Sequence, residues 1–226
     1  MTKKQNASLK IARSTNNPVP AKRGRGRPRE FDREWALDQA MKLFWKRGYE
    51  TTSMAELRAV LGITQASLYA AFGSKEQLFR DVVDLYLRTA NASTAQALAG
   101  GSTAREAIHS MMQAAVDAFS APGTPGGCLL ILGATNCAVE NKGIQDHLVS
   151  IRRQIARSIS ERLKRGQRDG DVPAGAPISA LTAYYSTVLH GLAFQSRDGA
   201  SQKTLTDVVH LAMSNWQQVI RSKSES

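Results

Sequence analysis

Residues 52–79 read TSMAELRAVLGITQASLYAAFGSKEQLF, and their capping and turn residues predict two short helices joined by a tight turn. Ser53 can cap the first helix, because Glu56 three residues later completes a capping box. Gly62 stands where a left-handed residue commonly ends a helix, and Thr64 can cap the second helix. This pattern, with a polar exposed face on the second helix, is typical of a helix-turn-helix that reads DNA.

The segments on either side of this stretch extend the helical pattern. A helix is predicted from Phe31 to Arg47, with Asp32 as its N-cap and Gly48 at its end. A longer helix of about 25 residues is predicted from Ser74 toward Gly100, where it would form a strut between two domains. Residues 30–80 would thus form a three-helix DNA-binding domain.

The remainder of the chain is also predicted to be helical. Apolar residues recur there at helical spacing in five segments, which are residues 103–119, 128–140, 143–168, 178–195 and 205–220. The predicted fold class is therefore all-α with about nine helices. Residues 81–222 would form the second domain, whose core this sequence is long enough to build.

The positive charge of the chain is concentrated at its N-terminus. The formal net charge is +11, and residues 1–29 hold nine lysines and arginines without any acid. This tail is predicted to be disordered. Its segment Arg25-Gly26-Arg27-Pro28 resembles an AT-hook, whose arginines enter the narrow, strongly negative minor groove of A·T-rich DNA. A solvated tail is the alternative interpretation for Arg25 and Arg27.

Other classes of protein receive little support from the sequence. No apolar run approaches the roughly 20 residues that span a bilayer, and no secretory signal is present, so a cytoplasmic, nucleoid-associated protein is expected. Cys128 and Cys137 would lie about 13.5 Å apart on one helix, too far for a disulfide. No catalytic motif, cofactor site or metal-ligand spacing is found.

Residues 26–87 resemble the tetracycline-repressor (TetR/AcrR) family of bacterial transcription regulators. The residues that carry this resemblance are Ala36, Ala40, Leu43, Phe44, Gly48, Tyr49, Thr51, Thr52, Ile63, Leu68, Tyr69, Phe72, Lys75, Leu78 and Phe79. The resemblance implies a recognition helix at residues 64–71. Its N-terminal end would meet base edges, where a glutamine can bind adenine and an alanine can contact a thymine methyl.

The resemblance also implies contacts with the DNA backbone from a threonine before the first short helix, from a tyrosine and from a lysine. The predicted DNA-binding residues are Arg25, Arg27, Thr51, Thr52, Thr64, Gln65, Ala66, Ser67, Tyr69 and Lys75. Three alternatives remain open at this point. Thr64 could serve as a helix cap alone, Tyr69 could be half-buried packing, and Lys75 could be simply solvated.

For residues 81–222 the resemblance implies an effector-binding and dimerisation domain. The last two helices would pair with those of a second copy, and a small-molecule pocket would lie between the helices. Candidate pocket residues are His109, Cys128, Asn136 and Tyr184, each of which could instead be an ordinary core or interface residue. Cys128 begins a predicted helix, whose dipole could lower the pKa of its thiol and make it a sensor.

The predicted function is that of a homodimeric, sequence-specific transcription regulator. Its partners would be double-stranded operator DNA, a second copy and a small-molecule effector. We expect a repressor that a small molecule releases from a palindromic operator. The alternative is a basic architectural DNA-binding protein without effector control, whose affinity would depend mainly on salt.

Overall fold

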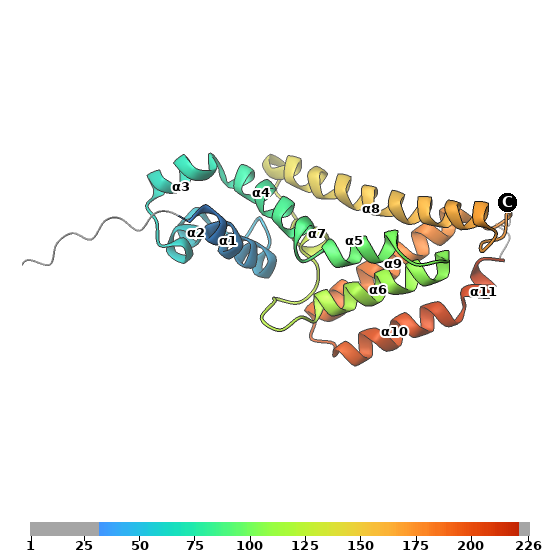
Figure 1. The fold of residues 1–226 in the computed structure, drawn as a ribbon. Helices are drawn as coiled ribbons and strands as arrows, with labels where there is room; N and C mark the ends of the chain where they lie inside the picture. Colours follow the sequence, from blue (N-terminus) through green and yellow to red (C-terminus); the bar gives the residue numbers. More distant parts are fainter. Residues whose placement is uncertain (1–31, 222–226) are drawn as a thin grey trace, which may run out of the picture. The chain divides into compact units, whose positions relative to one another are not determined.

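The computed structural model describes residues 32–221, and this range contains eleven α-helices, one 3-10 turn and no strand. The predicted all-α class is therefore confirmed. Arg25, Arg27 and the remainder of the predicted tail lie outside the described residues. The helices are α1 (Arg33–Arg47), α2 (Met54–Leu61), α3 (Gln65–Phe72), α4 (Lys75–Arg88), α5 (Ala92–Ala99), α6 (Ala104–Phe119), α7 (Leu129–Leu132), η1 (Val139–Asn141), α8 (Lys142–Asp169), α9 (Ile178–Arg197), α10 (Gln202–Ser214) and α11 (Trp216–Val219) (Figure 1).

Helices α1 to α3 and the start of α4 pack together into a unit that we call the head. The Asp32 carboxylate accepts hydrogen bonds from two backbone N–H groups of the first turn of α1, as predicted for its N-cap. Phe44, Leu57 and Leu68 from the three helices are almost completely buried. Phe79 of α4 meets Phe44 edge to face at 5.0 Å between ring centroids, so α4 completes the core of the head.

The predicted strut of about 25 residues is wrong, because it is broken into α4 and α5. The Thr89 hydroxyl donates to the Leu85 carbonyl at 2.8 Å, and the backbone N–H of Asn91 donates to the Tyr86 carbonyl at 3.0 Å. A threonine hydroxyl that bonds the carbonyl four residues back competes with the regular helix ladder. The break lets α5 turn and pack on α6.

The predicted helix over residues 128–140 is also wrong beyond its first turn. Only α7 is helical, and η1 follows after an irregular segment. The Gly133 carbonyl, which would accept from Cys137 in a continued helix, accepts instead from the Tyr49 amide at 2.7 Å. Cys128 and Cys137 therefore do not share a helix, and both are free thiols.

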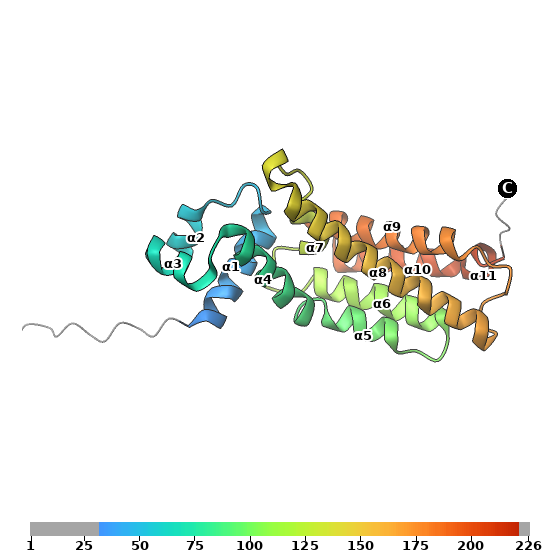
Figure 2. The same ribbon diagram turned by 90° about the horizontal axis from the view of Figure 1, so that it is seen from above.

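The C-terminal helices pack around a shared apolar core. In Figures 1 and 2, α6 runs beside α9 and α10, and α8 lies along α9, in agreement with their contacts. The apolar spacing predicted for residues 143–168 is confirmed, because α8 buries Ile144, Leu148, Ile151, Ile159 and Leu163, although it also buries Arg162. The predicted last helix is interrupted at Asn215, between α10 and α11.

None of the helices in the described range combines the length and the apolar character that crossing a bilayer requires.

Candidate nucleic-acid interface and ligand cavity

The turn between α2 and α3 has the predicted geometry. Ser53 and Glu56 form a reciprocal capping box at the start of α2. Gly62 ends the helix with φ 65° and ψ 27°, a left-handed conformation that favours glycine even though a side chain there would meet open space. Ile63 packs against the core of the head. The left-handed Gly62 and the packed Ile63 thus set the direction of α3 relative to α2.

Helix α3 buries one face and exposes the other. Leu68 and Phe72 point into the core of the head. The exposed face carries five of the predicted DNA-binding residues, which are Thr64, Gln65, Ala66, Ser67 and Tyr69. Tyr69 is 43% exposed, so its ring is available at the surface and does not pack in the core.

Thr64 caps α3 and remains at its exposed N-terminal end. Its hydroxyl accepts from the Ser67 amide at 3.2 Å and lies 3.0 Å from the Ser67 hydroxyl. These bonds fix the first turn of α3, where recognition helices contact base edges. Gln65 and Ala66 lie in the same turn and are exposed.

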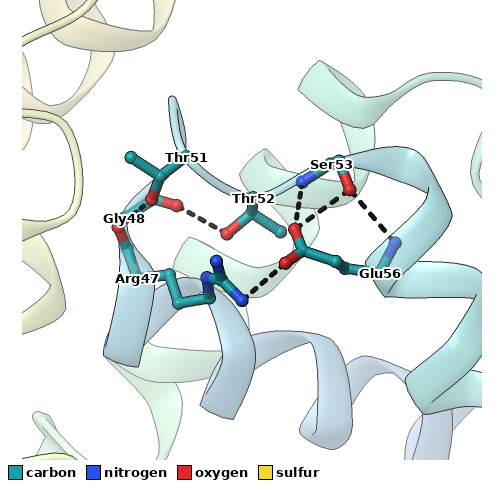
Figure 3. A network of polar contacts seen from close by, with 6 residues as sticks. All are labelled: Arg47, Gly48, Thr51, Thr52, Ser53 and Glu56. Atoms are coloured by element: carbon teal, nitrogen blue, oxygen red, sulfur yellow. Dashed lines mark hydrogen bonds and ion pairs between the residues drawn. The ribbon is translucent and has the colours of Figure 1, made fainter.

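The segment before α2 separates the two predicted threonine contacts (Figure 3). Thr51 is exposed, and its hydroxyl donates to the Arg47 carbonyl at 2.5 Å. Thr52 is fully buried, and its hydroxyl donates to the Gly48 carbonyl at 2.7 Å. A hydroxyl has one proton to donate, so Thr51 can reach a phosphate by exchanging its partner. Thr52 instead shapes the turn, which corrects the prediction of a phosphate contact from its side chain.

Lys75 is the first residue of α4, which follows α3 after Gly73 and Ser74. Its ammonium nitrogen lies 4.2 Å from the centroid of the Tyr49 ring, a cation–π contact that holds it near the α4 N-terminus. Partial burial lowers the pKa of the Lys75 ammonium, and the charge of Glu50 opposes this shift. Packing against Tyr49 thus holds the Lys75 side chain, which is not simply solvated.

A backbone contact links the head to α7. The Tyr49 amide donates to the Gly133 carbonyl, and the Trp45 indole donates to the Gly127 carbonyl at 3.2 Å. A side chain at Gly48 would lie 3.3 Å from the Gly133 carbonyl, which is closer than most side-chain contacts. The end of α1 therefore rests directly on the segment that contains α7.

Arg197, the last residue of α9, also contacts the end of α1. Its guanidinium donates to the carbonyls of Trp45 at 2.7 Å and Lys46 at 3.1 Å, and also to Gly126 at 3.2 Å. The last carbonyls of a helix lack partners within it, so Arg197 caps α1 with a cation. Burial lowers the pKa of its guanidinium.

A cavity of about 350 Å³ lies among the C-terminal helices, and this size suits a small organic molecule. Its walls come from α5, α6, α8, α9 and the residues around α7. Most of the lining is apolar and includes Leu98, Met111, Phe119, Ile131 and Leu189. The cavity and the head therefore share the α7 segment as a common boundary.

Of the four predicted pocket residues, Cys128 alone lines this cavity. It is buried and accepts a hydrogen bond from the Tyr86 hydroxyl at 3.5 Å. Burial raises the pKa of the Cys128 thiol, so the predicted lowering by a helix dipole is wrong. The other three lie elsewhere: His109 stacks near His210 between α6 and α10, Asn136 is exposed before η1, and Tyr184 is exposed on α9.

Two family models match the chain over the regions just described. Residues 36–82 match the model for bacterial regulatory proteins of the tetR family. Residues 104–212 match the model for the tetracyclin repressor-like C-terminal domain. The HTH-type transcriptional repressor ComR of Escherichia coli (strain K12) is 32% identical over 209 residues, covering 92% of this chain and 100% of ComR. The chain belongs to the TetR family.

Further relatives are similar to this TetR-family chain over nearly their whole length. The repressor BdcR of Escherichia coli (strain K12) is 30% identical and covers 83% of this chain and 90% of its own. A cysteine mutant of the TetR-family regulator CifR, solved with 26 bp double-strand operator DNA, is 39% identical with a TM-score of 0.80. That match covers 84% of this chain and 100% of CifR. The present TetR-family chain is a DNA-binding transcription regulator.

Sequence patterns missed several residues that the TetR fold brings together. Arg152 and Ser186 line the cavity, and no motif in the sequence marks either of them. Tyr49, Gly133 and Arg197 join the head to the C-terminal helices, and they are separated by tens of residues in the chain. The spacing of residues along the sequence does not indicate contacts between segments that are far apart in the chain. The prolines and glycines of residues 121–127 were the sole hint of an irregular junction.

Proposed function

We propose that the chain is a homodimeric repressor that binds a palindromic operator and leaves it when a small molecule fills the cavity. The observation that carries the proposal is the capped α3, whose first turn presents Gln65 and Ala66 at the surface of the head. The relatives ComR and BdcR are named as repressors, and the CifR mutant was solved with operator DNA. No catalytic reaction is assigned to the chain.

In this proposal residues 30–80 read DNA, and residues 81–222 bind the effector and form the dimer. The boundary lies inside α4, so one helix belongs to both parts and can transmit motion between them. Residues 1–29 would add minor-groove contacts through Arg25 and Arg27. Such a protein would act at the nucleoid, in the cytoplasm.

The dimer is supported by an exposed apolar face on α9 and α10. Large apolar side chains at the surface of these helices are Tyr184, Phe194, Val208 and Leu211, the last of which is 68% exposed. Small exposed residues of α9 lie between them, and a side chain added at Gly191 would meet open space. A second copy packed here by two-fold symmetry would cover the apolar residues and set the distance between two heads.

Effector control is supported by the position of α7. The residues just before and within α7 line the cavity, and Gly133 at its end holds the Tyr49 amide of the head. A ligand that favours a different position of α7 would shift the head. Operator half-sites require two recognition helices about 34–36 Å apart, so a changed distance would favour release.

The function is tested by selecting binding sites from random DNA duplexes. The proposal predicts an enriched sequence with two inverted half-sites, read by two copies of α3. Enrichment of no sequence over the starting pool would contradict it and would favour an architectural protein.

Gln65→Ala should relax the selected sequence at one base pair in each half-site. The side-chain amide can bond adenine in two places, and its loss should remove about 1–3 kcal/mol of discrimination there. Repeating the selection with this variant checks the prediction. An unchanged preference at every position would show that Gln65 does not read bases.

Lys75→Ala should weaken binding to all DNA sequences alike, by about tenfold, and should reduce the salt slope by about 1. The lysine would contact a phosphate, which carries no sequence information. Anisotropy titrations with operator and scrambled duplexes measure both effects. Lys164→Ala, at an exposed position on α8 outside the proposed DNA-binding and dimer surfaces, is the control and should change neither. A loss confined to the operator would contradict the phosphate contact.

A further inference from the structure

The ionisable groups of the cavity have a common character. Those that line it are Arg152, Arg153, His190 and Cys128, and no carboxylate is among the lining residues. The remaining surface is mostly apolar. An apolar cavity whose charged groups are all cationic attracts an anion and disfavours a cation.

Arg152 is the best placed of these groups. It projects from α8, is half-buried, and donates from one terminal nitrogen to the Leu130 carbonyl at 2.6 Å. Among the described residues no carboxylate forms an ion pair with it. A guanidinium has five N–H donors in a planar fork that suits carboxylates and related anions. Arg152 therefore has donors left for a ligand.

Helix α9 supplies a second donor from across the sequence. Ser186 lines the cavity, and its hydroxyl oxygen is buried without a hydrogen-bond partner in the described structure. His190 lies four residues further along and lines the cavity too, so both belong to one face of α9. An unpaired buried hydroxyl is costly, and a ligand oxygen would satisfy it.

A shallow groove beside the cavity has the same electrostatic sign. It shares Ala95, Leu98 and Ser158 with the cavity lining. Its charged residues are Arg157, Arg162, Arg165 and Arg168 against a single acid, Glu161. A groove with this excess of positive charge would steer an anionic ligand toward the cavity.

We propose that the cavity binds a small amphipathic organic anion, with its apolar body among the aliphatic and aromatic side chains and its acidic group at Arg152 and Ser186. This rests on the proposed effector control and names the chemical class of the effector. The anion would compete with the Leu130 carbonyl for Arg152, and Leu130 belongs to α7. Ligand binding would thereby act on the segment that holds the head.

Two fluorescent probes with a shared aromatic body test the proposal on the full chain. The first is 8-anilinonaphthalene-1-sulfonate, an anion, and the second is N-phenyl-1-naphthylamine, which lacks the sulfonate. Arg152→Gln should weaken binding of the sulfonate about tenfold and should change binding of the uncharged amine less than twofold. Arg105→Gln, at an exposed position on α6 outside the linings of both the cavity and the groove, should change neither.

Equal effects of Arg152→Gln on both probes, or no effect on either, would overturn the proposal, as would a failure of both probes to bind. Ser186→Ala serves if the Arg152 variant does not fold. This variant should weaken binding of the sulfonate about threefold and leave binding of the amine unchanged. An equal change in the binding of both probes would also overturn the proposal.

Operator affinity is measured separately by anisotropy. A chain that binds operator but shows no sulfonate-specific loss disproves the anionic ligand alone. A chain that shows the loss but selects no operator disproves the repressor function alone.

Discussion

Leu211→Asp is expected to convert the protein to a monomer and to weaken operator binding by at least about 100-fold. Leu211 is the most exposed large apolar residue of α10, and in the proposed dimer it would be buried against the second copy. An unpaired carboxylate buried at that position would be strongly unfavourable. Loss of the dimer removes the second head, whose linked binding contributes a factor of about 10²–10⁴. Analytical ultracentrifugation and operator titration measure the two effects.

Val139→Asp is the matched control for this substitution. Val139 is even more exposed, at 86%, and lies on η1, outside the apolar face of α9 and α10. The same change of apolar residue to acid should leave both mass and operator affinity within about twofold. A Leu211→Asp protein that remained dimeric, or a monomer with full operator affinity, would contradict the proposed interface.

Arg197→Ala is expected to lower the free energy of unfolding by about 2–3 kcal/mol. It removes three charge-assisted hydrogen bonds and leaves the last carbonyls of α1 without their cap. For a chain of this length, the melting temperature should fall by about 2–4 °C for each kcal/mol. Urea denaturation followed by circular dichroism measures the change.

Arg105→Ala provides the control, because Arg105 is an exposed arginine near the start of α6. Its removal should change stability by less than about 0.5 kcal/mol. Arg197→Lys keeps the positive charge but cannot reach three carbonyls with a planar fork, so an intermediate loss is expected. If Arg197→Ala unfolds like the control, the cap on α1 does not stabilise the fold.

Local signals in the sequence predicted the head well, because its geometry depends on residues close together in the chain. The Ser53–Glu56 capping box, the left-handed Gly62 and the Thr64 cap each act over three or four residues. Such signals are strong where propensity, capping and burial agree. The exposed face of α3 followed directly from the burial of Leu68 and Phe72.

Tertiary contacts explain why the helix predicted after Cys128 was wrong and why the cavity residues were missed. The helix after Cys128 stops because the Tyr49 amide takes the Gly133 carbonyl, a partner 84 residues away. The cavity lining depends on how α5, α6, α8 and α9 pack, so Arg152 and Ser186 carried no local signature. Periodicity shows which face of a helix is apolar, but it does not show which neighbour that face will meet.

A footprint across the promoter region of the gene for this protein, and of neighbouring genes, tests the central claim most directly. The measurement is made with the full chain and with a chain that lacks residues 1–29. We predict a discrete protected segment with internal two-fold symmetry in both cases, with weaker binding for the shortened chain because it lacks the basic arm. Uniform protection along the DNA, lost on removal of residues 1–29, would contradict a sequence-specific regulator and identify an architectural DNA-binding protein.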